Sequence, residues 1–140
     1  MLAMGSPPGQ EAWIVHLRDP SNKVGPQVML KDESVSTSEQ TARSLLGNES
    51  AGHIIDPDTG LPLKTMFAVS AVAKTATVAD ALSTTLLLVG PTKGKALLRN
   101  VPDASAVWVS PDAQVETVIG GPPILFGSGA SAAISHGQIP

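Results

Sequence analysis

Short runs of alternating hydrophobic and polar residues recur along the chain, and they predict β-strands. In the first run, Trp13, Val15 and Leu17 are expected to face the core. The last two runs are expected to form a hairpin across Pro111 and Asp112. The expected strands cover residues 12–17, 27–30, 34–38, 66–73, 104–110 and 114–119.

One stretch shows helical spacing instead. A helix is expected over residues 77–90, because apolar residues recur there every three or four positions: Val78, Leu82, Leu86 and Val89. Gly90 followed by Pro91 predicts its end, and a shorter helix is expected over residues 92–98. Together these elements predict an α+β fold, with an antiparallel sheet and helices packed on one face.

The composition narrows the class of protein. The 140 residues fit one domain, and the net charge of −3 shows no basic patch for nucleic acid. The absence of cysteine excludes disulfides and thiolate metal sites. No apolar run reaches the roughly 18 residues of a membrane span, and no signal peptide is recognised. Residues 117–140 carry no formal charge and are rich in Gly, Pro and Ser, so we divide the chain into residues 1–116 and an uncharged tail.

The first candidate site is the stretch His53-Ile-Ile-Asp-Pro-Asp-Thr-Gly60. Its two isoleucines favour a strand, Asp56 followed by Pro57 favours a type I turn, and Gly60 suits a left-handed backbone. The stretch is either an ordinary turn with a capping Asp56 and a partly buried His53, or a rigid loop that presents His53 at a site. The spacing fits both interpretations.

The second candidate site lies in the predicted helix. Asp80 and Thr84 are four residues apart and therefore share one face. A carboxylate and a hydroxyl offer the oxygen ligands that Mg²⁺ prefers. The pattern Thr77-x-x-Asp80 also fits a capping box, in which Asp80 only satisfies amides of the first turn. A third group, Ser36, Thr37 and Ser38, offers hydroxyls for a phosphate or is an ordinary strand edge.

Four segments, in this order, resemble motifs of the ApbE family of flavin transferases, with the resemblance running from about Met4 to about Gln114. The first two resemble its strand of the type Trp-x-Val-x-Ile-x-x-Pro and its Ala-x-Ala-Thr-Ser segment. The last two resemble His-Ile-Ile-Asp-Pro-x-Thr-Gly-x-Pro and Ala-Asp-Ala-x-x-Thr. The matching stretches are Trp13-Ile-Val-His-Leu-Arg-Asp-Pro20, Ser34-Val-Ser-Thr-Ser38, the segment from His53 to Pro62, and Ala79-Asp-Ala-Leu-Ser-Thr84.

The resemblance implies a T-fold-like arrangement and an FAD:protein FMN transferase. Such an enzyme uses Mg²⁺ and moves FMN from FAD onto a Thr or Ser hydroxyl of an acceptor protein. By motif position, Asp80 and Thr84 are the implied metal ligands, and His53 is the implied catalytic base. The implied contacts to the flavin nucleotide are Ser36, Thr37, Ser38 and Asp56.

The chain also departs from the family pattern. Glu39 and Gln40 stand where the family usually has Gly and then an aromatic residue. Residues 1–5 correspond to a point after the family's Gly-Gly-Asp/Asn motif, so the chain resembles a carboxy-terminal half, without the amino-terminal half and its export signal. Three hypotheses follow: an enzyme half, a flavin- or metal-binding module completed by a separate amino-terminal half or by self-association, or an inactive truncated product. If the amino-terminal half is missing, an open sheet edge and an uncovered apolar surface are expected, and the chain alone is expected to be marginally soluble or to associate.

Overall fold

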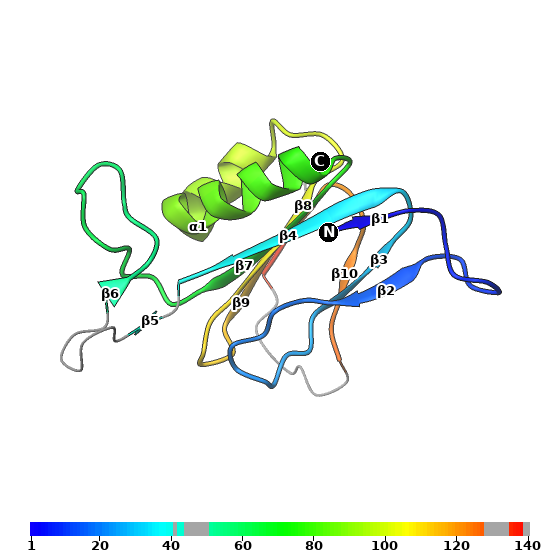
Figure 1. Ribbon diagram of the computed structural model, residues 1–140, viewed down its shortest axis with the longest axis horizontal. Coiled ribbons are helices and arrows are strands. Elements are labelled where there is room, and N and C mark those ends of the chain that lie inside the picture. Colours follow the sequence, from blue (N-terminus) through cyan, green and yellow to red (C-terminus); the bar gives the residue numbers. More distant parts are fainter. Residues whose placement is uncertain (41, 44–50, 128–134, 139–140) are drawn as a thin grey trace.

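A six-stranded sheet forms the centre of the molecule, in the strand order β1-β4-β7-β8-β9-β11 (Figure 1). The computed structural model describes residues 1–40, 42–43, 51–127 and 135–138. Neighbouring strands pair antiparallel, except that β11 runs parallel to β9. The strands are β1 (Leu2–Ala3), β4 (Glu33–Glu39), β7 (Ala68–Ala73), β8 (Ser105–Val109), β9 (Val115–Ile119) and β11 (Ser135–Gln138).

Two further layers cover the faces of this sheet. A three-stranded sheet of order β10-β3-β2 packs on one face, and the helix α1 lies across the other (Figure 1). The α+β fold with a helical layer on one face is confirmed, whereas the second sheet is a layer that the sequence analysis does not predict. The remaining strands are β2 (Trp13–His16), β3 (Gln27–Leu30) and β10 (Ile124–Leu125), with a separate pair β5 (Ala42–Arg43) and β6 (Ala51–Gly52).

The helix α1 (Ala76–Leu98) contains a break. Gly90 has a non-helical backbone (φ 73°, ψ 174°) and Pro91 follows it, so α1 consists of two helical segments, as predicted. Thr75 is the N-cap, and its side chain accepts a hydrogen bond of 3.3 Å from the Val78 amide. In the part of the chain that the structure describes, no helix is both long and apolar enough to cross a membrane.

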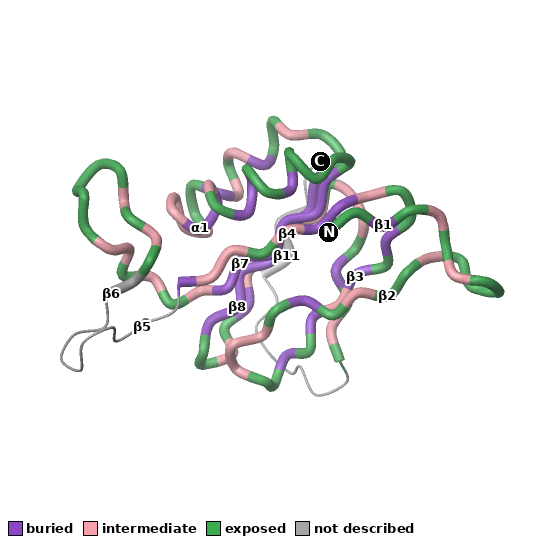
Figure 2. Tube along the Cα trace, viewed as in Figure 1, coloured by how far each residue is buried: buried purple, intermediate pink, exposed green. Residues whose placement is uncertain are grey.

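Two hydrophobic cores lie on the two faces of the central sheet, where Figure 2 shows the buried residues concentrated. Alternating residues of β8 serve both cores. Ala106 and Trp108 belong to the core under α1, whereas Val107 and Val109 belong to the core under the three-stranded sheet. Every residue of β7 and β8 is buried, because both faces of these strands are covered.

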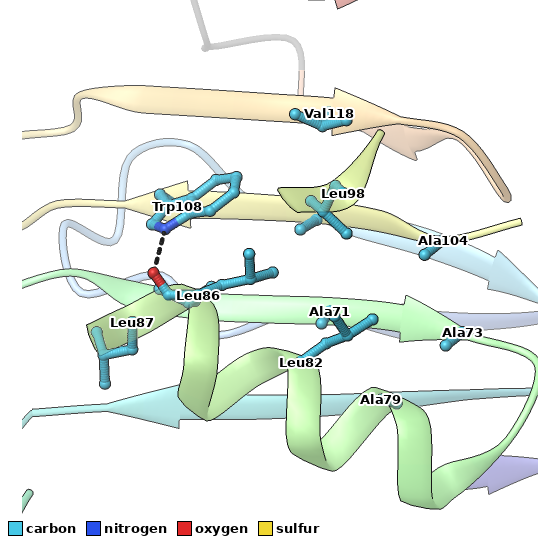
Figure 3. Packing of buried hydrophobic residues seen from close by; sticks show 12 residues of the cluster. Ala71, Ala73, Ala79, Leu82, Leu86, Leu87, Leu98, Ala104, Trp108 and Val118 are labelled. Atoms are coloured by element: carbon cyan, nitrogen blue, oxygen red, sulfur yellow. Dashed lines mark hydrogen bonds between the residues drawn. The ribbon is translucent and has the colours of Figure 1, made fainter. Parts of the chain in front are cut away.

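Trp108 is the largest fully buried side chain, and it anchors the break in α1. Its indole Nε1 donates a hydrogen bond of 3.1 Å to the Leu86 carbonyl, in the last turn before the break (Figure 3). Gly94, in the second helical segment, leaves room for the indole: a Cβ there would lie 2.6 Å from Trp108 Cζ2. The two helical segments therefore close over one tryptophan.

The first predicted strand is more exposed than expected. Trp13 lies opposite the buried Leu30, on the face that points to the core, yet 44% of its surface is exposed. Its indole donates to the Met4 carbonyl at 3.2 Å. Trp13 is exposed because β2 is an outer strand of its sheet. Residues 13–16 of this strand and residues 1–4 line an open hollow. Large hydrophobic side chains are exposed around this hollow, as expected for an apolar surface that no other part of the chain covers.

The outer edge of β4 is only partly paired. β1 pairs with Glu33 and Ser34, and the Met1 backbone exchanges two hydrogen bonds with Val35. Beyond Val35, no strand among the described residues pairs with this edge. The expected open sheet edge is therefore present. Association of the chain stays a prediction, which sedimentation of the purified chain would test.

Part of the segment predicted as an uncharged tail takes part in this architecture. The boundary between residues 116 and 117 falls inside β9, where Thr117 and Val118 are buried. Ile124 of β10 is buried in the core under the three-stranded sheet. Residues 128–134 and 139–140 of this segment lie outside the described residues.

Candidate functional site

Hydroxyl and carboxylate groups from β4 and α1 meet at the edge of the central sheet. We call Ser36, Ser38, Asp80, Ser83 and Thr84 the hydroxyl cluster. The Ser36 hydroxyl donates a hydrogen bond of 3.0 Å to Asp80 Oδ1. Ser38 Oγ lies 2.9 Å from Ser83 Oγ and 3.0 Å from Thr84 Oγ1. The predicted hydroxyl group on β4 and the predicted metal ligands on α1 therefore lie together in one cluster.

The periods of the two elements explain this arrangement. Side chains two apart on a strand share a face, so Ser36 and Ser38 both point toward α1. Residues three and four apart on a helix share a face, so Asp80, Ser83 and Thr84 point together toward β4. Ser83 is fully buried, whereas Asp80 and Thr84 are exposed. The two predicted metal ligands therefore lie at the solvent-facing rim.

The structure decides against Asp80 as a helix cap. The capping alternative requires the helix to begin at Thr77, but the N-cap is Thr75, and the first turn of α1 contains no acidic residue. The Asp80 carboxylate instead accepts from Ser36, which lies 44 residues away in the sequence. The alternative fails because the helix begins two residues earlier than the pattern indicates.

The donor set at this rim fits a hard cation. Asp80 and Thr84 present a carboxylate and a hydroxyl, and Mg²⁺ takes oxygen ligands, usually one or two carboxylates plus water and phosphate oxygens. Among the described residues, no three His, Cys, Asp or Glu side chains gather in a group that could hold a metal ion. Among the described residues, a cation held here would therefore find no further carboxylate beside Asp80 and would complete its coordination with other oxygens.

Two neighbouring β4 side chains point away from the hydroxyl cluster. Thr37 Oγ1 lies 2.7 Å from Ser70 Oγ on β7, on the opposite face of the sheet. Glu39 accepts a hydrogen bond of 2.8 Å from Arg18 Nε, and this bond raises the pKa of the arginine. Of the three hydroxyls predicted to contact a nucleotide, the structure brings two to the cluster and leaves Thr37 outside it.

The stretch from His53 to Gly60 forms a turn, but its closing hydrogen bond spans one residue more than that of the predicted type I turn. The Gly60 amide donates to the Asp56 carbonyl at 2.8 Å, and Gly60 has the left-handed backbone that the sequence predicts (φ 68°). The Asp56 side chain accepts from the Asp58 amide at 2.8 Å. Within the described residues, the exposed His53 side chain makes no hydrogen bond. The structure thus places Asp56 in its own turn, and no hydrogen bond joins His53 to the hydroxyl cluster.

A residue that the sequence analysis noted only as a departure holds this turn to the sheet. Gln40 follows β4 directly and is 5% exposed. Its Nε2 donates to the Leu63 carbonyl at 2.9 Å and to the Ile54 carbonyl at 3.4 Å, and its Oε1 accepts from the Ile54 amide at 3.0 Å. The signal available in the sequence is position: Gln40 continues the row of even-numbered residues that includes Ser36 and Ser38.

Comparison with known proteins points to one family. The ApbE family matches residues 1–108. The FAD:protein FMN transferase of Treponema pallidum (strain Nichols) is 39% identical over 116 residues, which are 77% of this chain and 31% of that protein. The FAD:protein FMN transferase of Escherichia coli (strain K12) is 31% identical over 114 residues, which are 71% of this chain and 32% of that protein. The chain therefore spans about a third of the length of these relatives.

Proposed function

We propose, because the chain belongs to the ApbE family, that it forms part of a Mg²⁺-dependent flavin transferase. The reaction would move FMN from FAD onto a Thr or Ser hydroxyl of an acceptor protein and release AMP. A bond would form between the hydroxyl oxygen and the phosphorus of FMN. The bond from that phosphorus to the oxygen retained by AMP would break, and the hydroxyl proton would pass to a base.

The meeting of two family motifs across β4 and α1 carries this proposal. Ser36 contacts Asp80 and Ser38 contacts Thr84, so the carboxylate and the hydroxyl lie together at an exposed rim. These two side chains would hold Mg²⁺, which when bound would neutralise the phosphate oxygens of FAD. This interpretation is favoured over a purely structural Asp80 because the carboxylate takes no part in capping the helix.

His53 is the residue that we assign as the base. It is exposed at the start of the turn. The Gln40 side chain holds this turn to the end of β4 by hydrogen bonds, and Gln40 lies only two residues after Ser38. A neutral imidazole accepts a proton near neutral pH, and general-base catalysis typically contributes about 10²–10⁴-fold to a rate. Asp56 would act by holding this turn, since its side chain accepts from the Asp58 amide.

The test is the intact mass of a Thr-bearing acceptor domain after incubation with this chain, FAD and Mg²⁺. We expect an added FMN mass that is absent when EDTA is present, absent with Asp80→Ala and reduced with His53→Gln. Transfer that survives both EDTA and Asp80→Ala would contradict the assigned metal site. Transfer unchanged by His53→Gln would contradict its role as base.

A second candidate function is a flavin- or metal-binding module that needs another polypeptide for turnover. It is favoured by one observation: the chain spans about a third of its relatives' length. Equilibrium dialysis with FAD, Mg²⁺ and the Thr-bearing acceptor domain separates the two functions. The module hypothesis expects FAD to be retained on the chain without any release of AMP, whereas the enzyme hypothesis expects AMP to accumulate.

A further inference from the structure

We propose that Ser36 and Ser38 are positioning residues that orient the Asp80 carboxylate and the Thr84 hydroxyl for a bound cation. This inference rests on the proposed function, and it gives the two serines a role different from direct contact with the flavin nucleotide. It follows from the distances within the hydroxyl cluster and from the number of protons that each hydroxyl can donate.

The carboxylate is oriented by one hydrogen bond. An ionised carboxylate only accepts hydrogen bonds, so Ser36 must be the donor in its 3.0 Å contact with Asp80 Oδ1. The other carboxylate oxygen, Oδ2, accepts no hydrogen bond from the described residues. Because the Asp80 side chain is exposed, this second oxygen is available to a cation at the rim. Ser36 thereby favours binding through one oxygen over binding through both.

The Thr84 hydroxyl is oriented by a chain of donors that ends at a carbonyl. Ser83 Oγ donates to the Asp80 main-chain carbonyl at 3.0 Å, and its other acceptor is Ser36 Oγ at 3.4 Å. Neither can donate to Ser83 in return, because a carbonyl has no proton and Ser36 gives its own to Asp80 Oδ1. With its single proton used, Ser83 accepts from Ser38 at 2.9 Å. Ser38 in turn has used its proton and accepts from Thr84 at 3.0 Å. Protons thus point inward along the whole chain, from Thr84 to Asp80.

This direction matters for cation binding. A hydroxyl that ligates a cation offers a lone pair, and its proton must point to another acceptor. Ser38 is that acceptor for Thr84, so the Thr84 lone pairs face the solvent-exposed rim. Without the Ser38 oxygen, the Thr84 hydroxyl would lose this acceptor and could turn its proton toward the cation. Residues that orient ligands in this way typically change metal affinity about 10–100-fold when they are removed.

β4 offers a matched control for the two serines. Ser34 lies on the same strand and the same face, two residues before Ser36, but its buried hydroxyl has no hydrogen-bond partner among the described residues. Ser34→Ala therefore makes the same chemical change as Ser36→Ala and Ser38→Ala without breaking a hydrogen bond. Ser38→Thr restores a hydroxyl at position 38 and separates loss of the hydrogen bond from a defect in folding.

The experiment measures Mn²⁺ binding, as a probe for Mg²⁺, by electron paramagnetic resonance on the full chain and its variants. We expect the dissociation constant to rise about 10-fold or more for Ser36→Ala and for Ser38→Ala. It should stay at the wild-type value for Ser34→Ala and recover with Ser38→Thr. Urea unfolding of each variant checks that the fold persists.

The possible results distinguish the positioning role of Ser36 and Ser38 from the metal site on which it rests. Wild-type affinity in Ser36→Ala and Ser38→Ala, together with loss of binding in Asp80→Ala, would overturn the positioning role and leave the metal site standing. No Mn²⁺ binding by the wild-type chain, or binding unaltered by Asp80→Ala, would overturn the metal site and the positioning role with it. An equal loss of affinity in Ser34→Ala would also overturn the positioning role, because that hydroxyl has no partner to orient.

Discussion

The hydroxyl cluster and the turn from His53 to Gly60 are built in opposite ways. The contacts between β4 and α1 in the cluster join residues that are 44 to 47 positions apart in the sequence. The side-chain bonds inside the turn join residues two positions apart. The cluster therefore exists only when β4 and α1 are packed, whereas the turn can form from its own residues.

Gln40 links these two regions by hydrogen bonds of its side chain. Gln40 ends the row of side chains that begins with Ser36 and Ser38, and its amide group bonds the base of the turn at Ile54 and Leu63. A locally stable motif therefore still needs a tertiary contact to be placed. If His53 acts together with Asp80, Gln40 sets where the turn leaves the sheet. Substitutions of Gln40, of Gly94 in α1 and of Gly60 in the turn should show how far the cluster and the turn depend on each other.

The largest effect is expected from Gln40→Ala. It removes both the acceptor for the Ile54 amide and the donors to two carbonyls, at a residue that is 5% exposed. Buried backbone groups left without partners cost about 1–3 kcal/mol each, so unfolding in urea should show a loss of about 2–4 kcal/mol. Amide exchange in the turn should accelerate, while Mn²⁺ binding at the cluster is retained.

Two variants control this prediction. Gln40→Glu keeps an acceptor for the Ile54 amide and loses the donors, so its effect should be intermediate. Gln10→Ala changes an exposed glutamine and should leave stability within about 0.5 kcal/mol of wild type. If Gln40→Ala left exchange in the turn unaltered, Gln40 would not be the link between the two regions.

The second largest loss of stability is expected from Gly94→Ala, which disturbs the packing of α1 against Trp108. The added Cβ would lie 2.6 Å from Trp108 Cζ2 and 3.0 Å from Leu86 Cδ2, and the rigid indole cannot move aside easily. Overpacking of this kind costs about 1–3 kcal/mol, which exceeds the gain of about 1 kcal/mol for alanine over glycine in a helix. Urea unfolding should therefore show a net loss of stability. Mn²⁺ affinity should also fall, because α1 carries Asp80 and Thr84.

The exposed helix residue Thr92 provides the matched control. Thr92→Ala lies in the same helical segment and changes helix propensity without a clash, so its stability should equal or exceed that of wild type. A Gly94→Ala protein as stable as Thr92→Ala would show that the contact with Trp108 does not limit packing.

A smaller and local effect is expected from Gly60→Ala. Its backbone has a positive φ of 68°, and no atom lies within 4 Å of the position that a Cβ would take, so the cost comes from the backbone alone. An alanine in this conformation costs about 1–2 kcal/mol. Exchange of the residue-60 amide should accelerate while Mn²⁺ binding is unchanged. Gly60→Asn should cost less, because asparagine tolerates the left-handed region; an equal cost for both variants would contradict the backbone explanation.

The smallest effect is expected at Asp19, whose loop gives a second example of a local turn for comparison. Burial raises the pKa of this carboxyl, but hydrogen bonds from Ser21, Gly25 and Val24 outweigh burial, and the net pKa is lowered. A lowered pKa means that the stabilisation is present above the ordinary aspartate pKa of about 3.9 and is lost as pH falls through the folded value. Urea midpoints at pH 7 and near pH 3 should differ less in Asp19→Asn than in wild type. The exposed Asp58→Asn should behave like wild type, and an equally flat response in both variants would contradict this assignment.

Much of the secondary structure was predictable because it depends on patterns of neighbouring residues. Alternation predicts β4, β7, β8 and β9 of the central sheet but not β1 or β11, helical spacing predicts the helix, and Gly90 with Pro91 predicts its break. The left-handed backbone at Gly60 follows from local turn chemistry in the same way. Four motifs in order were enough to indicate the ApbE family, which the comparisons show.

Local sequence is enough to define which short segments form strands, helix and turn, since each depends on residues a few positions apart. It does not define that Ser36 meets Asp80, that Gln40 holds the turn, or that Trp108 is buried while Trp13 stays exposed. Each of these outcomes depends on strand order and on which layer covers which face. Strand order and layer packing are determined by contacts between distant segments, and the hydrophobic period of a single segment does not encode them.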